Sequence, residues 1–137
     1  MEKFGMRNEE FGMEKKKSGP NAIAEKSKRF ALRIIRLYRF LTEEKHEFVL
    51  AKQLLRSGTS IGANIREALR GQSRADFYAK LSISLKEAEE TLYWLELLNE
   101  SGYLDKAGFE SICEDCQELI RLLVSITKTL RNSTKDR

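Results

Sequence analysis

The stretch RSGTSIGANIREA, residues 56–68, places two glycines and several small polar residues inside a segment whose neighbours have a helical pattern. Each glycine costs about 1 kcal/mol relative to alanine in a helix interior. Apolar residues nevertheless recur at helical spacing across residues 47–70, at Leu50, Leu54, Ile61, Ile65 and Ala68. We therefore expect a helix here, in which close packing of a neighbouring helix at Gly58 and Gly62 offsets their low propensity.

A second stripe on the same segment is polar. It consists of Gln53, Ser57, Ser60, Asn64 and Glu67, which also recur at helical spacing. Buried hydroxyls, amides and carboxylates cost free energy unless they are hydrogen-bonded. Two interpretations follow: an internal hydrogen-bonded network that specifies helix register, or a site for a ligand or partner.

The rest of the chain predicts three more helices. One begins after Pro20 and presents an apolar stripe that includes Ile23, Phe30, Ile34, Leu37 and Leu41. Gly71 suits the left-handed position after the helix of residues 47–70. Ser73 and Asp76 then resemble a capping box for a third helix, which Gly102 ends. Asp105 can cap the fourth.

Four long helices joined by short loops predict an all-α fold, an up-and-down antiparallel four-helix bundle over residues 21–133. Residues 1–20 are expected to form an N-terminal tail that is flexible or ordered by a partner, and residues 134–137 a C-terminal tail. The single proline and the lack of alternating β-branched runs argue against strands. Since the chain shows no signal peptide or membrane span, and its two cysteines are expected to stay reduced, we expect a cytoplasmic protein.

The first predicted helix carries a basic face with little acid nearby, formed by Lys26, Arg29, Arg33, Arg36 and Arg39. Such a face is either solvated or a contact for nucleic-acid phosphates. The formal net charge of +4 is compatible with a polyanionic partner but does not identify one.

The third predicted helix is apolar on two sides. Phe77, Leu81, Leu85 and their helical successors form one face, and Ala79, Ile83, Trp94 and Leu97 lie roughly opposite. A helix of this kind needs two partners, so self-association is expected. The candidate residues for contact between copies are Gly58, Gly62, Ile83, Trp94 and Leu97.

Two segments, QLLRSGTSIGANIREA (53–68) and FYAKLSISLKEAEETLYWLELLNESGYL (77–104), resemble the four-helix bundle family of 23S rRNA intervening-sequence proteins, also described as ribosomal protein S23-like. The resemblance covers most of residues 22–130. It implies a small cytoplasmic bundle, assembly as a homopentamer, and a relation to accessory proteins of diversity-generating retroelements. It also implies a signature at Arg56, Ser60, Asn64 and Glu67. This chain departs from the family in having Gly62 where relatives often carry proline.

Catalytic chemistry is not indicated. Cys113 and Cys116 have C-x-x-C spacing, but they lie on an apolar helical stripe and no second pair exists. His46 is the single histidine, so a di-iron site built from Glu-x-x-His pairs is excluded. We therefore expect no metal, no cofactor and no enzymatic activity.

Two functions remain open. The first is an oligomer associated with nucleic acid, RNA in particular, through the basic face of the first helix. The alternative is an oligomeric scaffold that binds a protein partner such as a reverse transcriptase.

Overall fold

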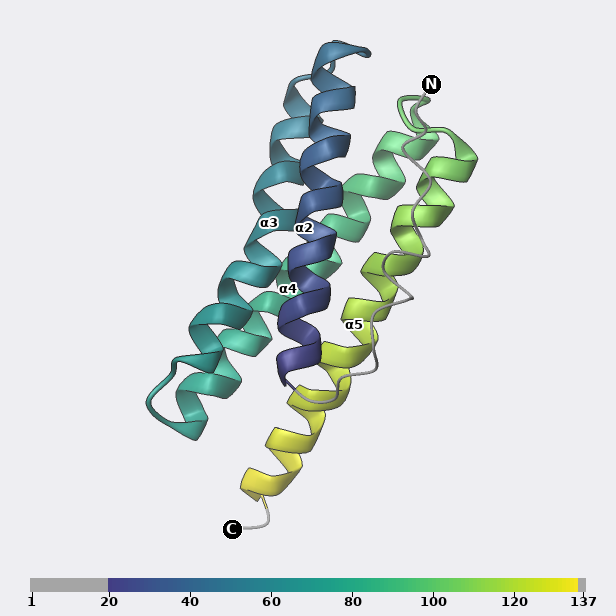
Figure 1. Cartoon of the computed structure of the whole chain (residues 1–137). Coiled ribbons are helices and arrows are strands. Elements are labelled where there is room, and N and C mark those ends of the chain that lie inside the picture. Colours follow the sequence, from purple (N-terminus) through teal and green to yellow (C-terminus); the bar gives the residue numbers. More distant parts are fainter. Residues whose placement is uncertain (1–19, 136–137) are drawn as a thin grey trace.

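The computed structural model describes residues 20–135 of the chain. They form four helices: α2 (Pro20–Glu43), α3 (Val49–Leu69), α4 (Arg74–Glu100) and α5 (Lys106–Lys135). Successive helices run in opposite directions (Figure 1), and this part of the chain contains no strand. The predicted all-α, four-helix fold is confirmed. Residues 1–19 and 136–137, which make up most of the two predicted tails, lie outside the described residues.

The helices pack in chain order around one core. α3 packs along both α2 and α4, and α4 also packs along α5, whereas α2 and α5 approach each other less extensively. α2 and α4 therefore lie diagonally across the bundle. Every helix contributes fully buried apolar side chains, among them Phe30, Ile34, Leu54, Ile61, Leu95, Ile112 and Leu119. Burying each such side chain stabilises the fold by about 1.5–3 kcal/mol.

The predicted caps of α4 and α5 are confirmed. The Asp76 amide donates to Ser73 Oγ at 3.0 Å, so Ser73 caps α4. The Gly108 amide donates to Asp105 Oδ1 at 2.8 Å at the start of α5. Gly102, with φ of 91°, follows the last turn of α4 in the left-handed conformation that glycine adopts without strain.

Gly71 does not adopt the left-handed conformation that we predicted, since Gly102 and His46 are the residues with positive φ in the part of the chain that the structure describes. The need for glycine at position 71 is steric instead. A Cβ atom there would lie 2.7 Å from Asp76 Oδ2 and 3.1 Å from the Ala68 carbonyl oxygen. A side chain at this position would therefore require Asp76 to move and the Ala68 carbonyl to shift slightly.

The start of α3 depends on a contact that the sequence pattern did not reveal. Glu47 lies just outside the helix, and its carboxylate accepts hydrogen bonds from the Leu50 amide at 3.0 Å and the Ala51 amide at 2.8 Å. These amides have no partner inside the helix, and the negative charge is favourable beside the helix N-terminus. The helix begins at Val49, two residues later than predicted, with Phe48 at the N-cap position and the Glu47 carboxylate bonded to amides of the first turn.

The two glycines of α3 face α2 of the same chain. A Cβ atom on Gly58 would lie 2.8 Å from Ile34 Cγ1, and one on Gly62 would lie 3.2 Å from Ser27 Oγ. The predicted close packing of a neighbouring helix is thus confirmed. The assignment of Gly58 and Gly62 to contacts between copies is wrong, because α2 already occupies the space in front of them.

Gly58→Ala is expected to lower the free energy of unfolding by about 1–3 kcal/mol, because overpacking against Ile34 exceeds the gain in helix propensity. Urea denaturation of the two proteins measures the difference. In an Ile34→Ala background the clashing atoms are absent, so the same glycine substitution should become stabilising. Equal destabilisation in both backgrounds would contradict this account of the contact.

Candidate functional site

The solvent-facing side of α2 is basic. It carries Lys28, Arg36 and Arg39, which are exposed and which we call the outer α2 face. Arg29 is half-buried beside them. Lys26 instead reaches α5, where its Nζ lies 3.2 Å from Glu118 Oε2. Of the five predicted candidates, Arg36 and Arg39 are thus exposed to solvent. The sequence analysis omitted Lys28, although its helical spacing to Arg39 places both on the same side.

Arg33 does not share this surface, and its predicted place on an exposed basic face is wrong. Its side chain is 4% exposed and lies between α2 and α5. Arg33 Nη1 lies 2.5 Å from Asp115 Oδ2, and Arg33 Nη2 donates to Ser111 Oγ at 2.9 Å. The sequence feature that could have predicted this ion pair is the position of Asp115 on the apolar side of its helix. A carboxylate buried there requires a cationic partner.

Burial governs the ionisation of Asp115. Desolvation raises the pKa of this carboxyl above its usual range, while the hydrogen bond and the charge of Arg33 act in the opposite direction. The folded state therefore depends on Arg33 to keep a charged group in the interior. The pair also joins α2 to α5, the two neighbouring helices that otherwise approach each other least.

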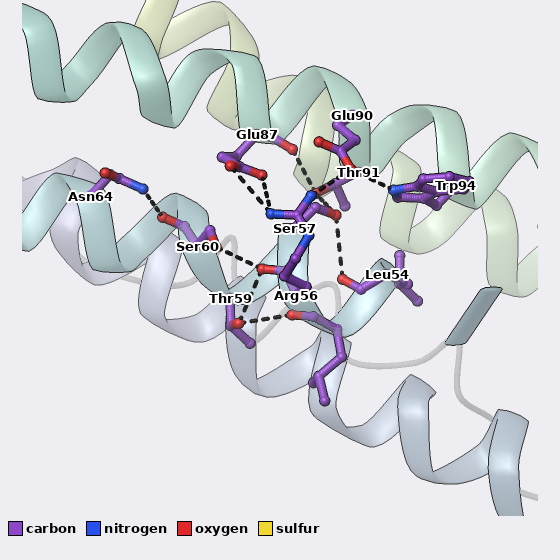
Figure 2. Close-up of polar contacts among 11 residues, drawn as sticks. Leu54, Arg56, Ser57, Thr59, Ser60, Asn64, Glu87, Glu90, Thr91 and Trp94 are labelled. Atoms are coloured by element: carbon purple, nitrogen blue, oxygen red, sulfur yellow. Dashed lines mark hydrogen bonds and ion pairs between the residues drawn. The ribbon is translucent and has the colours of Figure 1, made fainter. Parts of the chain in front are cut away.

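Three charged residues and the only tryptophan meet where α3 and α4 face solvent (Figure 2). Arg56 of α3 reaches across to α4, with Nη1 3.2 Å from Glu87 Oε1 and Nη2 2.5 Å from Glu90 Oε2. The Trp94 Nε1–H group donates to the same Glu90 oxygen at 3.1 Å. We call this group, Arg56, Glu87, Glu90 and Trp94, the α3–α4 cluster.

Arg56 and Glu90 of the cluster favour each other's charged forms. The hydrogen bond from Arg56 lowers the pKa of Glu90, with a further contribution from Trp94, and the contact with Glu90 raises the pKa of Arg56. Because the folded pKa of Glu90 is depressed, its contribution to stability is present above about pH 4.3 and is lost as the pH falls through the lower folded value. That contribution is small, since Arg56 is half-exposed and water screens the pair.

The other residues of the predicted signature make short-range contacts along α3 (Figure 2). Ser60 Oγ donates to the Arg56 carbonyl at 2.7 Å, and Asn64 Nδ2 donates to the Ser60 carbonyl at 2.9 Å. Glu67 Oε1 pairs with Lys80 Nζ of α4 at 2.8 Å. The four signature residues therefore share one edge of α3 that faces α4, and Arg56 and Glu67 both connect the two helices.

Beneath this edge the α3–α4 contact contains buried hydroxyls. Ser57 Oγ and Thr91 Oγ1 lie 2.8 Å apart, and Ser84 Oγ donates to the Ile61 carbonyl at 2.9 Å. A buried hydroxyl without a partner is costly, so these pairs fix the register of the two helices. The contacts support the first of the two interpretations of the polar stripe, a hydrogen-bonded network.

The side of α4 that points away from the core is partly apolar. Ile83 and Tyr93 are exposed there, while Trp94 and Leu97 are half-buried, and Trp94, at the margin of this side, also packs against the core. The Tyr93 and Trp94 ring centroids are 5.2 Å apart. We call these four residues the outer α4 face. The sequence analysis placed Ile83, Trp94 and Leu97 on this side but missed Tyr93, which lies at the edge of the same helical stripe.

The comparisons with known proteins agree with this architecture. Residues 20–125 match the 23S rRNA-intervening sequence protein family. The chain belongs to this family. It is also similar to the crystal structure of a protein with unknown function from the S23 ribosomal protein family of Bacteroides thetaiotaomicron VPI-5482, with a TM-score of 0.79 and 58% identity over 80% of this chain and 97% of that chain. No curated protein matches the chain.

The predicted family resemblance is thus confirmed, and neither description names an enzymatic reaction for the family. In this member both cysteines are buried in α5. Desolvation raises the pKa of each thiol, and Cys116 Sγ lies 3.4 Å from the Ala88 carbonyl oxygen. A reactive cysteine needs an accessible, stabilised thiolate, so the C-x-x-C spacing here reflects core packing.

Two further properties bear on the site. Among residues 20–135 no group of three or more histidine, cysteine, aspartate or glutamate side chains is arranged to hold a metal ion. None of the described helices is long and apolar enough to cross a membrane.

Arg33→Leu is expected to lower the free energy of unfolding at pH 7 by about 3–5 kcal/mol, because it leaves Asp115 buried without its cation. The double variant Arg33→Leu/Asp115→Leu should recover most of this loss. Guanidinium denaturation of both variants provides the measurement. Equal losses in the single and double variants would show that the ion pair is not what connects these positions.

The pH dependence gives an independent check. In Arg33→Leu the folded pKa of Asp115 lies above its unfolded value, so the proton stabilises the folded state at low pH and this stabilisation is lost as pH rises. The deficit of Arg33→Leu relative to the double variant should therefore shrink between pH 7 and pH 4. A constant deficit would mean that Asp115 is not the destabilising group.

Proposed function

We propose that this protein is a noncatalytic, homo-oligomeric cytoplasmic bundle that associates with RNA through the outer α2 face. The observation that carries the proposal is the presentation of Lys28, Arg36 and Arg39. These side chains are exposed, and none of them forms an ion pair with a described residue. Their charges are therefore available to an external anion, in contrast to those of Arg33 and Arg56.

The spacing suits a nucleic-acid backbone. Lys28 and Arg39 lie about 16 Å apart along the helix axis at 1.5 Å per residue, a length over which a strand presents several phosphates. Each phosphate that is neutralised releases counterions, which makes the affinity depend steeply on salt. Three cations give weak binding alone, so repetition of the face in an oligomer would supply avidity.

The family description supports RNA over other polyanions. Its members are named for sequences that intervene in 23S rRNA. Because the proposal concerns phosphate contacts from one helix face, it requires no catalytic residue. It is consistent with the buried cysteines and with the ion-paired carboxylates of the α3–α4 cluster.

We infer further that copies of the chain contact each other through the outer α4 face, and the family resemblance suggests a pentamer. Ile83 and Tyr93 are exposed beside Trp94, and interfaces are rich in such aromatic residues. Since α4 lies diagonally across the bundle from α2, an interface on α4 would leave the outer α2 face accessible. The same apolar surface favours the alternative function, a scaffold for a protein partner such as a reverse transcriptase.

The RNA proposal predicts the effect of removing three charges. Lys28→Gln/Arg36→Gln/Arg39→Gln should weaken binding to a structured rRNA stem-loop at least ten-fold at low salt. It should also reduce the slope of log K against log salt by about 2–3, one phosphate contact per side chain. A binding titration at several salt concentrations measures both quantities.

The matched control is Arg66→Gln/Lys86→Gln/Arg121→Gln, which removes the same three charge types from exposed positions on α3, α4 and α5. This protein should keep the wild-type slope. Equal weakening in both triple variants would reduce the proposal to a general charge effect. No binding by the wild-type protein at low salt would overturn the RNA proposal and leave the protein scaffold as the favoured function.

The self-association proposal predicts that Ile83→Glu reduces the mass in solution toward the 15.9 kDa of one chain. Light scattering during size-exclusion chromatography measures the mass, and circular dichroism should show unchanged helix content. Val124→Glu on α5 is the matched control, because Val124 is 43% exposed and Ile83 is 42% exposed. Loss of the oligomer in both variants, or a monomeric wild-type protein, would contradict the assignment to α4.

A further inference from the structure

The turn between α2 and α3 exposes two consecutive large apolar side chains. Phe48 is 57% exposed and Val49 is 73% exposed, more than any other large apolar side chain among the described residues. Neither contributes to the bundle core. Exposed apolar neighbours at one position on a small domain are typical of a contact surface.

The turn that carries them is held in a defined shape. His46 adopts a left-handed conformation with φ of 56°, and the Glu47 amide donates back to the Leu41 carbonyl at 2.9 Å. The Glu47 carboxylate is bonded to the first amides of α3. Phe48 therefore follows a fixed residue, and its ring centroid lies 6.5 Å from that of His46 at a tilt of 39°. The two rings are not stacked face to face.

This turn continues the outer α2 face. Arg39 lies one helical turn before the end of α2 at Glu43, and the turn to α3 follows at that end (Figure 1). Lys45 and Lys52 are exposed on either side of Phe48 in the sequence. The outer α2 face therefore ends at the turn that carries Phe48.

The size and charge of the patch decide between occupants. Two side chains offer far less area than the roughly 800 Å² per partner of a stable protein interface. Glu43 and Glu44 are exposed in the same turn, so the turn disfavours anionic groups, a lipid headgroup or a phosphate alike, and favours an uncharged group at Phe48. A nucleobase carries no charge and stacks on an aromatic ring of this size.

We propose that Phe48 is a stacking site for an unpaired base of an RNA loop whose backbone lies along the outer α2 face. The inference rests on the proposed RNA association and specifies its substrate class: RNA with unpaired bases, in preference to a continuous duplex. Val49, the next residue in the chain, is also exposed, but it has no π face and takes no part in the proposed stacking contact. Phe48 acts on the base, and the cations of α2 act on the phosphates.

The test uses the full chain and two RNAs, a hairpin with 2-aminopurine in its loop and a blunt duplex of the same stem. Phe48→Ala should weaken hairpin binding about ten-fold, the order expected for loss of one stacked base, and leave duplex binding within two-fold. Phe48→Trp should retain hairpin binding, and Val49→Ala should leave it unchanged. Wild-type protein should quench the 2-aminopurine fluorescence, and Phe48→Ala should not.

The possible outcomes distinguish the stacking site at Phe48 from the proposed RNA association through the outer α2 face. Salt-dependent binding of both RNAs that is unaffected by Phe48→Ala would overturn the stacking site and leave the outer α2 face in place. Equal weakening by Phe48→Ala and Val49→Ala would indicate a simple apolar contact, and a changed mass in solution would indicate a contact between copies. Each would overturn the proposal. Absence of binding to either RNA would overturn the proposed function as well.

Discussion

The close contact between α2 and α3 determines which side of α2 reaches solvent. Gly58 lacks a side chain where Ile34 packs, so the two helices can meet only with Ile34 turned toward α3. With that rotation fixed, Arg33 points toward α5 and Arg36 points outward. The rotation of α2 that sets Ile34 against Gly58 thus also places Arg33 in the interior and leaves Arg36 exposed. The surface chemistry of the bundle depends on this contact in its core.

Two of the charged contacts between helices have different physical roles. Arg33 and Asp115 are both buried, and the charge of each offsets part of the desolvation cost of the other in the low-dielectric interior. Their pair connects helices that otherwise approach each other little. Arg56, Glu87 and Glu90 remain in contact with water, so their charges contribute little free energy. Their geometry still matters, because together with the Ser57–Thr91 contact they align α3 with α4.

The sequence predicted what is local and periodic. Helical spacing identified all four helices, and the caps at Ser73 and Asp105 followed from residue type and position. It failed where the answer depends on a partner distant in the chain. A wheel drawn for one helix places Arg33 among other arginines, and only the rotation of α2 against α5 brings it to Asp115, 82 positions away. Likewise, the spacing of Gly58 and Gly62 predicts a groove on α3, but it does not identify α2 as the helix that packs there.

The position of Trp94 has a practical consequence for anyone who studies this protein by its intrinsic fluorescence. It is the only tryptophan of the chain, it lies half-buried on the outer α4 face, and its indole N–H is bonded to Glu90. Its emission is therefore sensitive to the polarity of that surface and to the ionisation of one carboxylate. Because Trp94 also packs against the hydrophobic core, a thermal melt followed at the tryptophan band would report the loss of core packing together with changes at the α3–α4 edge, and circular dichroism would follow the loss of helix separately.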